Sequence, residues 1–334
     1  MKYFITGATG FVGGHVARQL IEGGHVVIAL ARNPAKASDL TALGVTVVPG
    51  DITDKASMRE PMTGVDGVFH VAAWYEVGLK DSSMAYRINV EGTRNVLELM
   101  RELNVPKGVY TSTLAVFSDT DGKVVDESYR YAGGANGHNS EYDRTKWLAH
   151  YEVALPMMRE GLPLVIVQPG VVYGPGDASA MGETVRDYLR GKLPMVPQKA
   201  AYAWGYIDDI AHAHILAMDK GKAGETYIIA GPVHTFIEAL DIAQKVTGIP
   251  PSRLHPSPTM MKATAAMMSA INRIVPLTGM FHPETLRSIA GATYIGSNAK
   301  ARRELGYAPR SLEEGFRQTL PQEMVKLGIA AKPS

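Results

Sequence analysis

The feature that most constrains the fold is a glycine-rich turn between a short apolar run and a helical stretch. Residues 6–13 read TGATGFVG, which places the pattern G-x-x-G-x-x-G on Gly7, Gly10 and Gly13. Such glycines let backbone N–H groups approach a pyrophosphate, and the following helix directs its positive end at the phosphates. An ordinary glycine turn has the same letters, but the position after the first strand favours a dinucleotide site.

The first half of the chain alternates apolar runs with helical stretches. Continuous apolar strands separated by helices indicate a parallel sheet covered on both faces, here a Rossmann doubly wound α/β sheet. Gly, Pro and Asp bound the runs, where loops must turn. The expected strands are 2–6, 25–31, 46–49, 67–72, 108–111 and 164–168.

The pattern changes after Val172, where prolines become frequent and the segments are shorter. A chain of 334 residues has room for about two domains or one large one. We expect residues 1–172 to form the NAD(P)-binding domain and residues 173–334 to form mainly a smaller substrate-binding lobe. The segment from about 205 to 222 is expected to return to the first domain.

Composition excludes several kinds of site. The chain has no cysteine, which rules out disulfides, zinc–thiolate sites, iron–sulfur clusters and a cysteine nucleophile. The formal net charge of +1 provides no basic field for nucleic acid or an anionic membrane. Glycines interrupt the N-terminal apolar run, unlike a signal peptide, and 259–281 is too polar to span a bilayer. We therefore expect a cytoplasmic protein.

The end of the second apolar run bears on the choice of cofactor. NAD enzymes usually place Asp or Glu there for the ribose 2′-OH, but this chain has Ala31 followed by Arg32. Arginine accommodates a 2′-phosphate, so NADP(H) is favoured over NAD(H), unless Arg32 is only a surface charge. Farther on, the Asp51 carboxylate could accept a hydrogen bond from the adenine amine or cap the next helix.

Tyr142 and Lys146 form the pattern Y-x-x-x-K at the start of a helical stretch that runs to about Met158. Their spacing places both side chains on one helix face. A phenol with a pKa of about 10 is a poor catalyst at neutral pH, but a neighbouring ammonium lowers that pKa. Tyr188 and Lys192 match too, but that match runs into Gly191 and Pro194, so its helix is doubtful.

Two further polar positions are candidates beside this pair. The fifth strand ends in Thr111-Ser112-Thr113, where a hydroxyl could bond the reacting oxygen or simply satisfy backbone groups. Asn89 begins another helical stretch and is interpreted either as a helix cap or as part of the site.

The motifs occur together and in order, and with them the chain resembles the extended short-chain dehydrogenase/reductase family, the NAD(P)-dependent epimerase/dehydratase group. The resemblance covers nearly the whole chain. The motifs that carry it are TGATGFVGG (6–14), GDITD (50–54), HVAA (70–73), NVEGTRNVL (89–97), TSTLAVF (111–117), YDRTK (142–146), QPGVVYGPGD (168–177), YIDDIAHAH (206–214) and RRELGYAPR (302–310).

The resemblance implies a Thr–Tyr–Lys site on Thr113, Tyr142 and Lys146, supported by Asn89. Lys146 would lower the pKa of Tyr142 and hold the ribose hydroxyls. Substrate would lie between the lobes, against Trp74, Tyr75, Thr113, Tyr173 and the Met-rich segment. The cofactor-binding residues it implies are Gly7, Thr9, Gly10, Phe11, Val12, Gly13, Arg32, Asp51, Ile52, Ala72, Ala73, Tyr142, Lys146, Pro169 and Val172.

One departure from the sugar-nucleotide members is Gln168, which stands where many of them have Arg. The stretch HNSEYDRTK (138–146) and the Ala31-Arg32 pair look more like the dihydroflavonol reductase and hydroxysteroid dehydrogenase branch. The favoured function is an NADP(H)-dependent carbonyl reductase acting on a small, moderately apolar ketone or aldehyde. The alternatives are a sugar-nucleotide epimerase or dehydratase with tightly bound NAD and, third, a non-enzymatic NADP sensor.

Family resemblance also implies a homodimer, through the helices after Asn89 and around Tyr142. No metal site is expected, because His212 and His214 are two positions apart in a helical stretch and point to different sides. The Met- and Ala-rich stretch around Met260 and Met267 is interpreted as core or as a lid helix.

Overall fold

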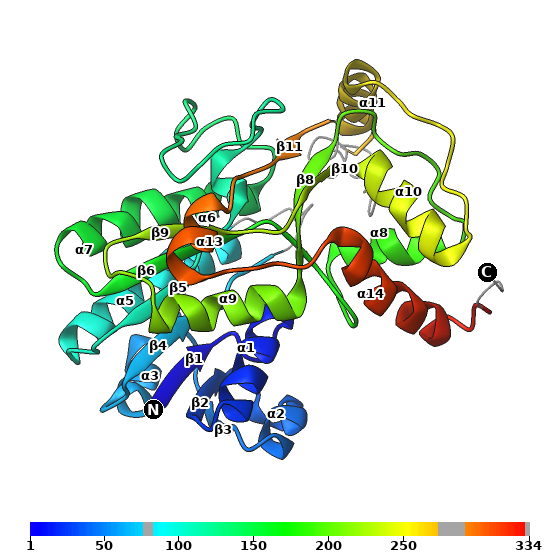
Figure 1. Ribbon diagram of the computed structural model, residues 1–334. Coiled ribbons are helices and arrows are strands. Elements are labelled where there is room, and N and C mark those ends of the chain that lie inside the picture. Colours follow the sequence, from blue (N-terminus) through cyan, green and yellow to red (C-terminus); the bar gives the residue numbers. More distant parts are fainter. Residues whose placement is uncertain (76–82, 273–290, 331–334) are drawn as a thin grey trace.

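The computed structural model describes residues 1–75, 83–272 and 291–330 (Figure 1). Its main sheet has seven strands in the order β3-β2-β1-β4-β5-β6-β9, and every neighbouring pair is parallel. The expectation of a doubly wound parallel sheet is thereby confirmed. The strands are β1 (Lys2–Thr6), β2 (Val26–Ala31), β3 (Thr46–Pro49), β4 (Gly67–His70), β5 (Gly108–Thr111), β6 (Leu164–Pro169) and β9 (Thr226–Ile229).

Helices cover both faces of this sheet. On one face α1 packs against α9, and apolar side chains of both join one core with the sheet. The members of this layer are α1 (Phe11–Glu22), α2 (Ser38–Ala42), α9 (Ile207–Asp219) and α13 (Ala299–Leu305). The opposite layer comprises α3 (Lys55–Met62), α4 (Ser83–Tyr86), η2 (Arg87–Gly92), α5 (Thr93–Glu102), α6 (Glu141–Leu148), η4 (Ala149–Ala154) and α7 (Leu155–Arg159).

The second lobe is a small sheet with its own helices and an aromatic core (Figure 1). Strand β8 is central: β7 and β11 pair with it in parallel and β10 antiparallel. Helices α10 and α14 each begin with a capping box, which satisfies backbone donors at the helix start. The elements are β7 (Val171–Tyr173), β8 (Ala201–Tyr206), β10 (Val233–Thr235), β11 (Thr293–Tyr294), α8 (Ala180–Leu189), α10 (Phe236–Thr247), α11 (Pro258–Ile271) and α14 (Leu312–Lys326).

The chain returns to the first lobe over more than one segment. Helix α9 lies within the expected 205–222 segment and packs on α1, but β9 and α13 also join the first lobe. The sequence did not predict β9 (TYII), which lies in the half of the chain where the pattern is less regular. Tertiary pairing with β6 makes it a strand.

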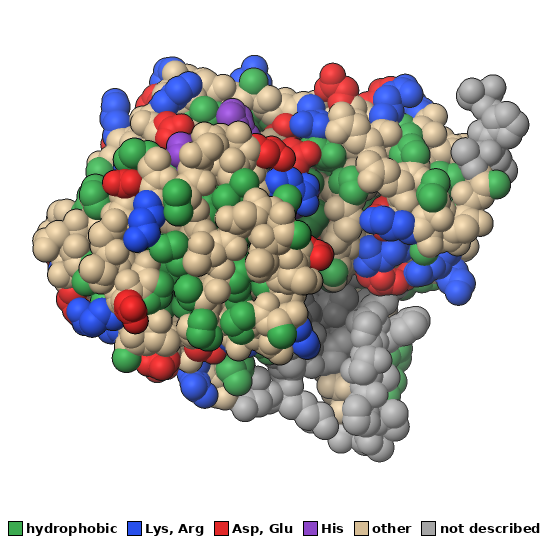
Figure 2. Space-filling model, turned by 90° about the horizontal axis from the view of Figure 1, so that it is seen from below, with side chains coloured by type: hydrophobic (Ala, Val, Ile, Leu, Met, Phe, Trp, Pro, Cys, Tyr) green, Lys and Arg blue, Asp and Glu red, His purple; other side chains and the backbone are tan. Residues whose placement is uncertain are grey.

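The Met- and Ala-rich segment is a helix as far as Ile271, and the rest of 259–281 lies mostly outside the described residues. Met261 is buried, whereas Met260 and Met267 are exposed, so the core interpretation holds for Met261 and not for the other two. Among the described residues, none of the helices is both long and apolar enough to span a bilayer. Acidic and basic side chains are interspersed on the face in Figure 2, as their near balance predicts.

Candidate active site

The glycine turn lies between β1 and α1 and packs tightly against the end of β4. Gly7 has a φ of +79°, and a Cβ there would lie 2.6 Å from the backbone nitrogen of Ala72. A Cβ on Gly13 would lie 2.2 Å from the Gly7 carbonyl oxygen. No side chain caps the start of α1, and its first turn holds no acidic residue. The turn therefore fits a dinucleotide pyrophosphate, which backbone N–H groups at the helix start would bind.

The residues expected around the adenosine end lie at the ends of β2 and β3. Arg32 is exposed directly after β2. The Asp51 carboxylate accepts hydrogen bonds from the Thr53 backbone nitrogen and hydroxyl, at 2.8 and 2.9 Å. The side chain that caps α3 is Asp54, so the interpretation of Asp51 as a helix cap is wrong. Ile52 is buried in the core beside α3.

Asn89 connects the loop after β4 to the helix of the Tyr–Lys pair. Its Oδ1 accepts from the Trp74 backbone nitrogen at 2.7 Å, and its Nδ2 donates to the Trp74 carbonyl at 3.1 Å. Nδ2 also donates to the Thr145 hydroxyl at 2.9 Å. Because η2 continues α4 into α5, Asn89 lies inside a helical stretch, and its interpretation as a helix cap is wrong. It instead holds the segment that contains Ala72, Ala73 and Trp74.

Tyr142 and Lys146 both lie on α6, one turn apart. The Ser140 side chain caps this helix by accepting from the Asp143 backbone nitrogen at 3.1 Å. The helix continues through η4 and α7 to Arg159, close to the expected end at Met158. The other Tyr-x-x-x-Lys match differs, because α8 ends at Leu189, before Lys192. The Tyr188 hydroxyl donates to the Ile249 carbonyl at 2.6 Å, inside the second lobe.

Thr113 meets Tyr142 at the end of β5. Its hydroxyl accepts from the Ala115 backbone nitrogen at 3.1 Å, which caps η3 (Leu114–Phe117), and the side chain lies near enough to the Tyr142 phenol to lower its pKa. The ring of Tyr75 meets that of Tyr142 edge-on, with the centroids 4.7 Å apart. A hydroxyl, a phenol and an aromatic wall thus share one place at the carboxyl edge of the sheet.

Burial sets the proton affinities of the Tyr–Lys pair. It raises the pKa of Tyr142, as do the nearby Tyr75 and Asp143, while the hydrogen bond with Thr113 lowers it. Burial also lowers the pKa of Lys146 to about 7. The expected lowering of the Tyr142 pKa by Lys146 is therefore not what the structure gives. Loss of hydration outweighs the attraction of a lysine that is itself only partly charged at neutral pH.

Lys146 is 2% exposed. Its Nζ donates to the Thr111 carbonyl oxygen at 2.8 Å and to the Tyr110 hydroxyl at 3.2 Å. The sequence interpretation missed Tyr110. A signal existed, because a buried tyrosine in an otherwise apolar strand needs a partner for its hydroxyl.

Pro169 and Val172 flank the turn from β6 into the second lobe, where Pro169 is buried and Val172 half-buried. Tyr173 does not face substrate. It is 3% exposed and packs edge-on against Trp204 and Phe316, so the expected substrate contact is corrected to a core contact. Strand alternation turns Tyr173 into the second lobe, and its hydroxyl lies against Gly315.

Gln168 is buried, 1% exposed, and neither of its amide atoms has a hydrogen-bond partner in the described part of the chain. His212 is exposed, whereas His214 is buried with Nε2 2.9 Å from the Thr111 hydroxyl, as expected for histidines on different sides of a helix. Across residues 1–75, 83–272 and 291–330, no group of three or more candidate ligands could hold a metal ion.

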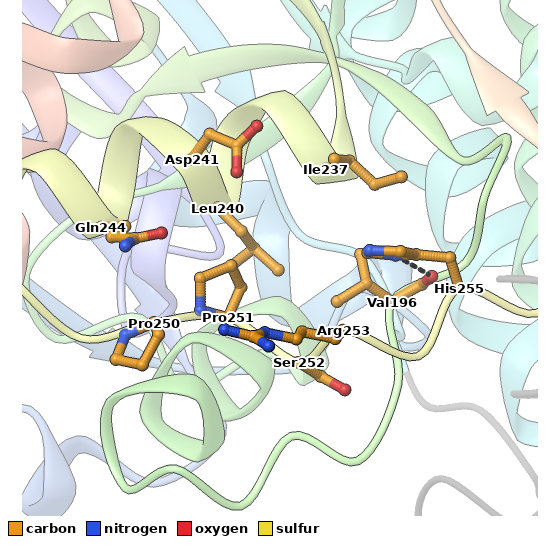
Figure 3. Close-up of a pocket in the computed structure, with 10 residues that line it drawn as sticks. All are labelled: Val196, Ile237, Leu240, Asp241, Gln244, Pro250, Pro251, Ser252, Arg253 and His255. Atoms are coloured by element: carbon orange, nitrogen blue, oxygen red, sulfur yellow. Dashed lines mark hydrogen bonds between the residues drawn. The ribbon is translucent and has the colours of Figure 1, made fainter.

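A separate cavity of about 250 Å³ lies in the second lobe (Figure 3). Residues of α10, including Asp241 and Gln244, line one side, and the segment 250–255 lines the other. None of the residues assigned above to the cofactor or to the Tyr–Lys pair lines it. This cavity is therefore separate from the residues expected to hold cofactor and substrate.

Comparison with known proteins bears on the same residues. The family model described as "NAD dependent epimerase/dehydratase family" matches residues 3–230, which contain the glycine turn, Thr113, Tyr142 and Lys146. The chain belongs to this family. It is an NAD(P)-dependent oxidoreductase of the extended short-chain dehydrogenase/reductase type, and the expected resemblance is confirmed.

Several known proteins are similar along most of the chain. Sterol demethylase protein B of Methylococcus capsulatus is 30% identical over 95% of this chain and 96% of its own length. A putative dihydroflavonol 4-reductase of Synechocystis is 34% identical over 74% of this chain and 73% of its own. The crystal structure of gox2253 superposes with a TM-score of 0.84 at 29% identity, covering 98% of both chains.

Proposed function

We propose that this family member is an NADP(H)-dependent carbonyl reductase, or an alcohol dehydrogenase in the reverse direction. Its substrate is a small, moderately apolar ketone or aldehyde. The observation that carries the proposal is that Thr113, at the end of β5, lies close enough to the Tyr142 phenol to lower its pKa, while Lys146 is buried one turn farther along the same helix. Similarity to a putative dihydroflavonol 4-reductase supports a reductase.

Each residue of the site has a distinct role in the proposed reduction. Backbone N–H groups in the first turn of α1, which the glycines let the cofactor approach, would hold its pyrophosphate, and Pro169 and Val172 would lie beside the nicotinamide. The bound nicotinamide supplies the hydride. Tyr142 Oη gives its proton to the carbonyl oxygen as that oxygen gains charge. Thr113 Oγ1 donates a hydrogen bond to the same oxygen and lowers the energy of the developing alkoxide.

Lys146 keeps Tyr142 ready for the next cycle. A phenol whose pKa is raised holds its proton at neutral pH, so Tyr142 begins as an acid. Once the proton has left, the phenolate is a buried anion that needs a nearby cation. The amine of Lys146, whose pKa is about 7, can supply that charge at neutral pH.

Preference for NADP(H) is part of the proposal. Arg32 is exposed at the end of β2, and the residue before it is alanine, so no carboxylate stands there to repel a 2′-phosphate. We also propose that Trp74 and Tyr75 line the substrate cleft. A homodimer through α5 and α6 remains a proposal, and sedimentation that gives a monomer would refute it.

The direct test is oxidation of NADPH and NADH by the purified protein with aromatic, steroid-like and aliphatic carbonyl compounds. Tyr142→Phe is expected to lower kcat by about 100-fold or more, the range of general acid catalysis. Tyr188→Phe is the matched control, because it removes a phenol from the second Tyr-x-x-x-Lys match, and its turnover should stay within about twofold. Equal activity of Tyr142→Phe and the parent would contradict the proposal.

A second candidate function is a sugar-nucleotide epimerase or dehydratase, which the family description favours. Such an enzyme would use the same three residues and keep NAD bound through its cycle. This function would be favoured if the denatured protein released NAD and the native protein turned over none of the carbonyl compounds. The buried, uncharged amide of Gln168 favours the reductase, because it provides no cation for a sugar nucleotide.

A further inference from the structure

A series of buried polar side chains extends from Lys146 into the first lobe, away from the reacting phenol. Lys146 Nζ lies 3.2 Å from Tyr110 Oη, and the Thr93 side chain is near enough to that hydroxyl to lower its pKa. Thr93 Oγ1 is 3.0 Å from His70 Nε2, and His70 Nδ1 is 2.7 Å from Thr6 Oγ1. All five side chains are at most 2% exposed, so water does not compete for these hydrogen bonds.

The donors and acceptors in this series fit a single arrangement of protons. The Thr93 hydroxyl donates to the Asn89 carbonyl at 2.7 Å, so toward His70 and Tyr110 it can only accept. Burial holds the pKa of His70 at about 3, so its ring is neutral and carries one proton. That proton is on Nε2 and points at Thr93, while Nδ1 accepts from the Thr6 hydroxyl.

The role of the Tyr110 hydroxyl follows from its contact with the amine. Lys146 Nζ donates to it, so toward Lys146 the hydroxyl is an acceptor. The Thr111 carbonyl is a second acceptor, 2.8 Å from Nζ. Together they bind two of the three N–H groups of an ammonium ion, and one N–H group is left over.

We propose that Tyr110 is a positioning residue for the reaction: backed by Thr93 and His70, its hydroxyl orients the ammonium group of Lys146 and favours its protonated form. One N–H group then remains for the cofactor and Tyr142. The inference rests on the proposed function, in which Lys146 provides the charge behind the phenol. The Tyr110 ring also lies near Nζ, 4.8 Å from centroid to nitrogen, but a phenylalanine would keep that attraction.

Tyr110→Phe tests the hydroxyl alone. It leaves no donor without a partner, since Thr93 still accepts from His70 and still donates to the Asn89 carbonyl, so the variant should fold. Loss of an acceptor for a charged donor disfavours the protonated amine. The alkaline limb of the kcat/KM profile for NADPH-dependent reduction is therefore expected to move down by about one pH unit, with a fall in kcat on the order of tenfold.

The control is Tyr307→Phe, which removes another buried phenol, one whose hydroxyl has no hydrogen-bond partner among the described residues. Its pH profile should match that of the parent. A readout independent of turnover is the Kd for NADPH from fluorescence titration between pH 6 and 9. Its pH dependence should shift in Tyr110→Phe and stay unchanged in Tyr307→Phe.

Failure of this inference and failure of the proposed function give different results. Absence of turnover in the parent refutes the carbonyl reductase, and the Kd profile still tests Tyr110. Unchanged profiles of kcat/KM and Kd in Tyr110→Phe overturn the inference. Should that variant not fold, Thr93→Val is expected to shift the profile in the same direction, because without its polar neighbour the Tyr110 hydroxyl can turn its proton toward the neutral amine, and Thr93→Ser is expected to restore it. Equal profiles of Thr93→Val and Thr93→Ser overturn the inference too.

Discussion

The two lobes bury different kinds of side chain. The carboxyl edge of the first lobe buries hydroxyls, imidazoles, an amide and an amine, and nearly all of them are held by hydrogen bonds. The second lobe is packed mainly by aromatic rings, such as Trp204 against Tyr173 and Phe316. Buried polar groups need fixed partners, whereas aromatic rings need only well-fitting neighbours. The first lobe thus holds polar groups that could take part in a reaction, whereas the second lobe is stabilised mainly by the packing of its side chains.

The largest expected difference between the lobes is their response to acid. Burial lowers the pKa of His70 and His150 to about 3 and that of His214 to about 4, and all three lie in the first lobe. In the unfolded chain they bind protons below about pH 6.5, so the unfolded state takes up more protons. Stability should therefore fall, by several kcal/mol in total, as the pH drops from about 6.5 to 4.

Hydrogen exchange at pH 7 and pH 5, corrected for intrinsic rates, measures this difference. Amides of β4 and β5 should lose more protection at pH 5 than amides of β8. A control is His234→Gln, because His234 lies in the second lobe and is only half-buried. Equal loss of protection in the two sheets would show that the lobes unfold as one unit.

The next effect concerns the aromatic core. Phe316 is 3% exposed and contacts both Tyr173 and Trp204, so Phe316→Ala should lower the free energy of unfolding by about 3–5 kcal/mol. Denaturant unfolding measures it. Val325→Ala on the same helix is the control, since Val325 is 80% exposed, and should change stability by less than about 0.5 kcal/mol. A similar loss in both would contradict the assignment of Phe316 to the core.

Replacing the buried Lys146 with methionine should increase the stability of the folded protein, whereas most substitutions of buried residues decrease it. The parent Lys146 has a folded pKa of about 7, below its unfolded value, so its contribution to stability rises between about pH 7 and 10. Methionine removes the cost of burying the amine. The variant should therefore be more stable than the parent near pH 7, by a few kcal/mol, and nearly inactive.

Thermal or denaturant unfolding from pH 7 to 10 measures this change. The advantage of Lys146→Met should shrink by about 1.4 kcal/mol per pH unit as the parent gains stability. Lys300→Met is a control, because that lysine is only partly buried and pairs with Glu225. A constant difference over the whole range would show that Lys146 is charged in the folded protein.

The smallest effect is expected at the cofactor site of the first lobe. Arg32→Ala should weaken NADPH binding by about tenfold, the loss of one charge-assisted hydrogen bond, and leave NADH binding unchanged. Fluorescence titration with both cofactors measures it. Lys36→Ala is the control, because Lys36 is an exposed cation four residues farther on. Equal losses for NADPH and NADH in Arg32→Ala would contradict contact with the 2′-phosphate.

The main sheet was largely predictable, since each expected strand is a strand of the structure with ends shifted by two residues at most. The exceptions share a cause. β9 and the second-lobe strands lie from Val171 onward, where prolines interrupt the apolar pattern, and pairing with distant segments makes them strands. Tyr173 was misplaced because a short tyrosine-containing run does not reveal which lobe its alternate side chains will face.

The sequence by itself determined the local features: the glycine turn after β1, the helical spacing of Tyr142 and Lys146, and the alternation of strands and helices. These depend on the geometry of a few consecutive residues. Tertiary structure alone decided that Asn89 holds Trp74 and Thr145, that burial raises the pKa of Tyr142 and lowers that of Lys146, and that Tyr110 accepts from Lys146. The physical reason is that hydrogen-bond partners and desolvation come from segments far apart in the chain, which meet only when the sheet and its helices have assembled.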